Sequence, residues 1–77
     1  MQLTFDETAD AVYVYFSENV VARTHEINDH VSIDYDDNDE PVGVEFLDVS
    51  DGIDLDNVPF RAEVSRLLEE SHIKQYA

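Results

Sequence analysis

The sequence predicts an α+β fold: an antiparallel β-meander of about five strands, followed by one C-terminal amphipathic helix packed on the sheet. Three observations support this. Short runs of β-branched and aromatic residues alternate with polar residues between positions 3 and 47. Asp, Asn and Gly residues, which favour turns, separate these runs. After an acidic stretch at 48–57, apolar residues recur at the spacing of one helix face.

The densest run of strand formers is 11–16, and both of its faces are apolar. Its two rows are Val12, Val14 and Phe16 on one side, and Ala11, Tyr13 and Tyr15 on the other. A strand with one wet face would alternate with polar residues, so this strand is predicted to be central. The core of the domain would cover one side, and something else would cover the tyrosines.

The remaining strands are predicted on both sides of this run, at 3–5, 20–27, 31–35 and 41–47. The strand at 20–27 is the least regular, because Arg23 and His25 lie in the same row as Val21 and Ile27. A bulge or an exposed half is therefore expected there. Pro41 suits the first position of its strand, where no ladder hydrogen bond is lost.

The helix is predicted to begin near Pro59 and to end near Ser71. Asn57 or a residue beside it is expected to cap its first turn. The stripe that would pack on the sheet consists of Phe60, Val64, Leu67 and Leu68. We expect a single domain over 1–77, with the sheet in 1–50 and an acidic linker and helix in 51–77.

Charge is the outlying feature of the composition. The 77 residues include 19 acidic side chains and 4 Lys or Arg, giving a formal net charge of -15, and there is no cysteine. Without cysteine there is no disulfide and no thiolate zinc site. The charge argues against binding a nucleic-acid backbone, and no apolar run is long enough to span a membrane. Dispersed carboxylates keep a surface hydrated in concentrated salt, so we expect the cytoplasm of a halophilic prokaryote; an ordinary acidic protein is the alternative interpretation.

Two motifs resemble a family of small prokaryotic proteins, the domain of unknown function 2283. The segment 5–14, F-D-E-T-A-D-A-V-Y-V, is similar to the family pattern Y-D-x-x-A-D-A-x-Y-I. The segments 31–37 and 41–50 are similar to its V-x-V-D-x-D and V-G-I-E-I-L-D-A-S patterns. The sequence departs from the pattern at His30 and Pro41, and the C-terminal helix lies outside the match. The resemblance implies a sheet-rich fold without an established activity, and an antitoxin-like or partner-binding role.

The acidic residues that match those motifs are candidates for a paired-carboxylate site: Asp6, Asp10, Asp34, Glu45 and Asp48. The simpler interpretation is that Asp6 and Asp10 accept backbone N–H bonds within their own turn. Four residues also have calcium-loop spacing, namely Asp34, Asp36, Asn38 and Glu45. Asp39 stands where that loop needs glycine, so a solvated hairpin is the preferred interpretation.

Ala11, Tyr13 and Tyr15 are the predicted interface residues, because tyrosine combines a large apolar area with a hydroxyl group. The leading functional hypothesis is a non-enzymatic module that forms a homodimer or binds a small, basic protein partner, with no cofactor. The alternative is a metal-binding protein or hydrolase that uses the clustered carboxylates. An internal cover for the tyrosines is the competing structural interpretation.

Overall fold

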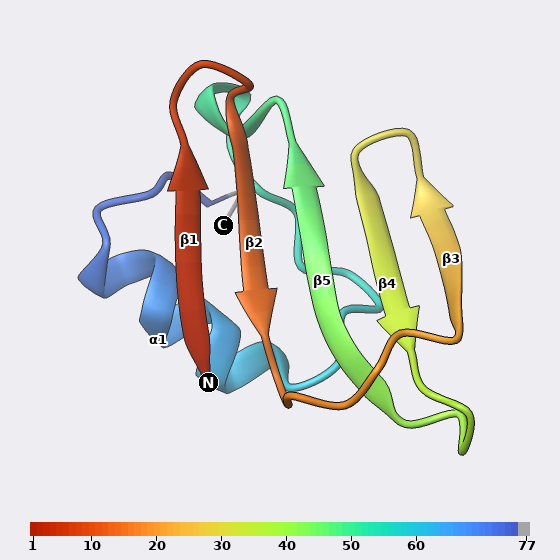
Figure 1. Ribbon diagram of the computed structural model, residues 1–77. Helices are drawn as coiled ribbons and strands as arrows, with labels where there is room; N and C mark the ends of the chain where they lie inside the picture. The colour runs from red at the N-terminus through yellow and green to blue at the C-terminus, as the bar shows by residue number, and fades with distance from the viewer. Residues whose placement is uncertain (76–77) are drawn as a thin grey trace.

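The computed structural model describes residues 1–75, which form a five-stranded antiparallel sheet with one helix behind it (Figure 1). The strands are β1 (Gln2–Asp6), β2 (Ala11–Tyr15), β3 (Arg23–Asn28), β4 (Val31–Tyr35) and β5 (Pro41–Leu47). A 3-10 turn, η1 (Val49–Asp51), and the helix α1 (Arg61–Glu70) follow. The predicted α+β class, with five antiparallel strands and one C-terminal helix, is confirmed.

The strand order differs at one point from the sequential order of a meander. It is β1-β2-β5-β4-β3, so β2 lies beside β5 rather than β3. The reason lies in composition. Val42, Val44 and Phe46 give β5 a fully buried row and a central place, whereas the polar β3 suits an edge.

The reordering requires a long connection between β2 and β3, residues 16–22, which we call the crossing segment. The sequence predicted only a short turn at 17–19 and placed the start of the third strand at Val20. Instead, Val20 is 86% exposed and β3 begins at Arg23. Figure 1 shows the crossing segment passing in front of β5, on the side opposite α1.

Hydrogen bonds attach the crossing segment to the strands beneath it. The N–H groups of Phe16 and Ser17 donate to the Val42 carbonyl, and the Ala22 N–H donates to the Tyr35 carbonyl at 2.7 Å. The Asn19 amide donates to Asp36 at 2.9 Å. The segment is therefore part of the folded structure at this end of the sheet.

Both sheet edges have short strands, and the edge strand β3 carries further features that discourage pairing. Its register shifts between Glu26 and Asn28, which confirms the predicted irregularity. It also carries charged side chains on an exposed strand, a common protection of sheet edges. The strand β5 begins at Pro41, as predicted.

The core lies between the sheet and a second layer made of α1 and the segment before it. The predicted linker at 48–57 contributes three buried side chains, Val49, Ile53 and Leu55, and Val58 after it is buried too, so this segment is part of the core. From the sheet and helix come Val12, Val14, Val31, Ile33, Val44, Phe46, Val64 and Leu68. Each fully buried aliphatic side chain contributes about 1.5–3 kcal/mol, so this layer accounts for much of the stability.

The helix is present as predicted, but its N-terminus is built differently. Phe60 is the N-cap residue in a left-handed conformation (φ 55°), without a side-chain cap, while Pro59 and Asn57 lie before the helix. Val64 and Leu68 are buried and Leu67 is partly buried, whereas Phe60 is 48% exposed. Its ring packs edge-on against Phe16 at 5.0 Å between centroids. No helix among residues 1–75 is long and apolar enough to cross a membrane.

Candidate functional site

The sheet face opposite α1 is the candidate site, and we call it the open face. Strand alternation places Tyr13 and Tyr15 there, because Val12 and Val14 point into the core. Pairing extends two rows of residues across the sheet. They are Thr4, Tyr13, Glu45, Ser32 and Glu26, and Gln2, Tyr15, Gly43, Asp34 and Thr24.

Tyr13 crosses its neighbouring strand to reach the next one. Its hydroxyl donates to Asp34 Oδ2 on β4 at 2.5 Å, and the ring passes over Gly43 of β5. A Cβ at position 43 would lie 2.4 Å from that hydroxyl oxygen, so only glycine leaves the tyrosine its space. Thr24 donates to the other oxygen of Asp34 at 2.5 Å. This network fixes the Tyr13 ring in one place.

The environment of Tyr13 disfavours its ionised form. Partial burial is the largest cause, followed by the hydrogen bond to Asp34 and by the nearby negative charges. Together they raise the pKa of the Tyr13 phenol far above its ordinary value of 10.0. Tyr13 therefore remains a neutral hydrogen-bond donor at any physiological pH.

Tyr15 is the more accessible of the two tyrosines, with 44% of its surface exposed. Its ring lies 4.5 Å from the Tyr13 ring, centroid to centroid, at an interplanar angle of 54°. A hollow of about 470 Å³ lies over both rings. Its other lining residues come from β1 and the crossing segment, with Val42 from β5. Residues of the same chain thus flank part of the tyrosine surface. No layer of residues 1–75 covers the open face as a whole.

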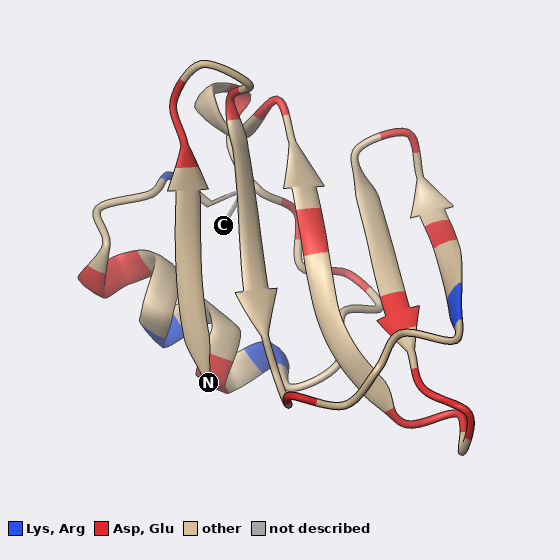
Figure 2. Ribbon diagram, in the orientation of Figure 1, with Lys and Arg blue, Asp and Glu red and all other residues tan. Residues whose placement is uncertain are grey.

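The open face is acidic. Strand alternation and the register put Asp6, Glu26, Asp34 and Glu45 on it, and Figure 2 shows these negative positions on all the strands except β2. The four Lys and Arg residues lie elsewhere. Arg61, Arg66 and Lys74 are in or after α1, and Arg23 stacks over the Tyr35 ring at 4.7 Å and pairs with Asp39. The face carries negative charge without compensating basic residues.

Asp6 and Asp10 differ in what they bind. Asp6 accepts the Ala9 N–H at 3.1 Å within its own turn, as predicted. The Asp10 carboxylate instead accepts the N–H of Ser50 at 3.1 Å and its hydroxyl at 2.7 Å, forty residues away. It thereby caps the 3-10 turn η1, for which Asp48 supplies no side-chain bond. Asp48 lies 3.1 Å from the exposed His30 ring.

The residues with calcium-loop spacing are engaged separately. Asp34 binds Tyr13 and Thr24 on the open face. Asp36 closes the β4–β5 hairpin by accepting the N–H groups of Asn38 and Glu40, and the Asn19 amide. The Glu40 bond first, and then the Asn19 bond, lower the pKa of the Asp36 carboxyl. Among residues 1–75, no group of three or more His, Asp and Glu side chains is arranged to hold a metal ion.

The fold and the open face define a small α+β domain with an acidic, tyrosine-bearing surface. Residues 2–50 match the family described as Protein of unknown function (DUF2283), and the chain belongs to this family. The matched region ends at Ser50, the residue that Asp10 holds. Comparisons with curated proteins and with solved structures give no significant match.

Sequence reasoning singled out the tyrosines but missed three features of their surroundings. These are the crossing segment as a wall, Gly43 as the space beneath Tyr13, and Asp34 as its acceptor. A glycine between Val42 and Val44 in a strand was the available signal, because glycine there often marks a close approach. The bond from Asp10 to Ser50 gave no local signal.

Proposed function

We propose that this protein is a non-enzymatic binding module whose open face takes up a basic segment of a small protein partner. The observation that carries the proposal is the pairing of exposed tyrosine surface with four carboxylates on one sheet face. Tyrosine is enriched at interface centres, and complementary charge guides the choice of partner. Neutralisation of a basic protein, as by an antitoxin, is the form of this role that the resemblance implied.

Homodimer formation through the same face is the alternative. A two-fold interface would place the acidic rows of two copies against each other, because an isologous contact uses the same patch twice. Placing like charges opposite each other costs free energy, and this cost is smallest in concentrated salt. A basic partner removes that cost, so we rank it first.

The test is an NMR titration with a short synthetic peptide in which arginine and serine alternate. We expect amide shifts on β2, β5 and β4 and none on α1, with binding that weakens as KCl is raised. A peptide of alternating glutamate and serine is the control and should produce no shifts. Shifts spread equally over the helix would show that the open face has no special role.

Sedimentation of the protein alone in dilute and in molar KCl tests the alternative. The basic-partner proposal expects a monomer in dilute salt. A dimer that is lost in Tyr15→Ala would instead favour self-association through the open face. Tyr15 is suited to this test because its partial exposure makes the substitution mild for the fold.

A further inference from the structure

The hollow beside the two tyrosines has an aromatic floor, and its walls combine polar side chains with Val21 and Val42. Gln2 and Thr4 of β1 form one wall, and Ser17, Glu18 and Asn19 of the crossing segment form another. The floor is the surface of Tyr13 and Tyr15. The volume of about 470 Å³ is far larger than a single side-chain head group, so the hollow can admit one together with its stem.

The floor is ordered before anything binds. Tyr13 is held by its bond to Asp34 and seated over Gly43, and Tyr15 packs against it with ring centroids 4.5 Å apart. The faces of aromatic rings attract cations, by about 0.5–1 kcal/mol at exposed sites and more where water is removed. A preformed floor lowers the entropy cost of binding.

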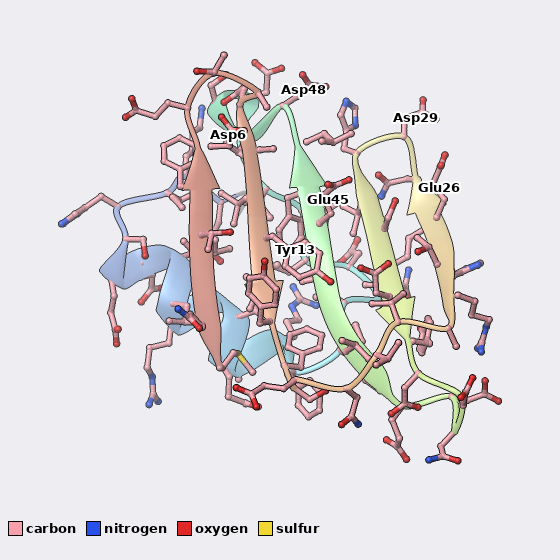
Figure 3. All side chains as sticks on the ribbon, in the orientation of Figure 1. Asp6, Tyr13, Glu26, Asp29, Glu45 and Asp48 are labelled. Atoms are coloured by element: carbon pink, nitrogen blue, oxygen red, sulfur yellow. The ribbon has the colours of Figure 1, made fainter. Side chains whose placement is uncertain are left out.

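The charge around the floor is negative throughout. Among residues 1–75, Glu18 is the only charged residue that lines the hollow, and Glu45 is the register partner of Tyr13 (Figure 3). Neither carboxylate takes part in a hydrogen bond or ion pair with another residue of the described chain, 1–75, whereas both oxygens of Asp34 are occupied. Within the described part of the chain, no Lys, Arg or His lines the hollow.

We propose that this hollow binds the guanidinium group of one arginine side chain of the partner. The planar guanidinium stacks on the exposed face of the Tyr15 ring, beside the tilted Tyr13 ring, and its fork of N–H donors meets the Glu18 carboxylate and the neutral oxygens of the walls. An ammonium group lacks the plane and the fork, so arginine is preferred to lysine. This inference rests on the proposed function. It places the centre of the interface with the partner at a site for one arginine side chain.

The test uses N-acetyl-arginine methylamide as the probe and its citrulline counterpart, which has the same shape without the charge. NMR titration should show saturable shifts at the Tyr13 and Tyr15 rings and at the amides of 17–19. The citrulline compound should leave these signals unchanged, and the lysine compound should bind more weakly. Tyr15→Ala should weaken arginine binding by about two- to fivefold, the range that an exposed cation–π contact predicts. Glu18→Gln should weaken it by up to about fivefold through the lost ion pair.

The matched control is Glu63→Gln, which removes one charge from the exposed surface of α1 and should leave the affinity unchanged. Equal effects of Glu18→Gln and Glu63→Gln would overturn the inference, because they would indicate attraction by net charge alone. So would shifts that are absent, or equal for arginine and citrulline. If the alternating arginine peptide still maps to the open face in that case, the proposed function stands and only the arginine site fails.

Discussion

At the scale of single residues, the contact between Tyr13 and Gly43 organises the open face. The tyrosine belongs to β2 but hydrogen-bonds to β4, and it can do so because the strand between them has no side chain at this point. The backbone of Gly43 is not in the left-handed region, so the requirement for glycine is steric rather than conformational. An alanine there would meet the tyrosine ring and hydroxyl directly.

We expect Gly43→Ala to lower the free energy of unfolding by about 1–3 kcal/mol, the usual cost of forcing a side chain out of its place. In a Tyr13→Ala background the same substitution should be neutral or stabilising, because alanine suits a strand interior better than glycine. Urea denaturation of the four proteins measures this. Equal costs in both backgrounds would show that the ring does not occupy the space over Gly43.

Alkaline pH should destabilise the protein partly through Tyr13. The folded-state pKa of its phenol is raised above the ordinary 10.0, so its contribution to stability is complete below pH 10 and declines as pH rises beyond that value. Tyr13→Phe keeps the ring but lacks this titration. We expect it to cost about 1 kcal/mol at neutral pH through the lost hydrogen bond. The difference from the wild type should shrink in denaturation curves above pH 10, and a constant difference would contradict the assignment.

At the scale of elements, Asp10 joins the β1–β2 turn to η1. Its carboxylate binds Ser50, and its carbonyl accepts the Val49 N–H at 3.1 Å. The two sequence motifs of the family, at opposite ends of the matched region, therefore meet in space. The segment that follows η1 carries part of the core. The contact between Asp10 and η1 therefore fixes the position from which this segment starts.

Asp10→Ala should lower the free energy of unfolding by about 1–2 kcal/mol, as the loss of a helix cap does. Asp6→Ala is the matched comparison, because Asp6 makes one bond within its own turn, and it should cost less. Ser50→Ala should add little to Asp10→Ala if the two residues act together. Thermal or urea denaturation of the single and double variants gives the coupling, and strict additivity would exclude it.

Asp36 should make the β4–β5 hairpin sensitive to acid. The folded-state pKa of its carboxyl is lowered from the ordinary 3.8, so its contribution to stability is present above that pH and is lost as pH falls through the lower folded value. Asp36→Asn can still accept the two N–H bonds of the turn but does not titrate. The difference in stability between wild type and Asp36→Asn should therefore shrink in acid, and urea denaturation across an acid pH series measures it.

The strands and the helix could be predicted from the sequence, but the order of the strands in the sheet could not. Alternation located β4 and β5, and a dense run of strand formers located β2; each of the three buries one row of apolar side chains. Which strand lies beside β2 depends on total burial, and the charged pattern of β3 was the one signal for an edge. The buried residues at 49–58 were missed because Val49, Ile53, Leu55 and Val58 follow no single period. Their segment packs as irregular backbone, and hydrophobic periodicity detects only helices and strands.

At the scale of the whole molecule, the two faces of the sheet have different roles. Apolar side chains between the sheet and the second layer supply the stability, while the opposite face carries tyrosines and carboxylates. The sequence predicted the tyrosine pair as the centre of the site, since both rows of β2 are apolar. The walls of the hollow come from β1 and the crossing segment, whose positions depend on the strand order.

The net charge sets the expected response of the whole molecule to salt, and this response tests the expectation that the protein works in concentrated salt. The formal charge is -15, and within residues 1–75 only two acidic side chains, Asp39 and Asp56, pair with an arginine, both of them exposed. Most carboxylates therefore repel one another across a small surface. Molar salt shortens the screening length to about 3 Å, so the melting temperature should rise steadily from dilute buffer to molar KCl.

A variant with Glu63, Glu69 and Glu70 changed to Gln separates charge repulsion from a general effect of salt. These three side chains are exposed on α1 and lie outside the open face, so their removal reduces the negative charge without altering the core. The variant should melt at a higher temperature than the wild type in dilute buffer and should gain less from KCl. Thermal denaturation across a KCl series measures both slopes. Parallel slopes would mean that salt acts on apolar burial rather than on the carboxylates, and a flat wild-type curve would contradict the adaptation to salt itself.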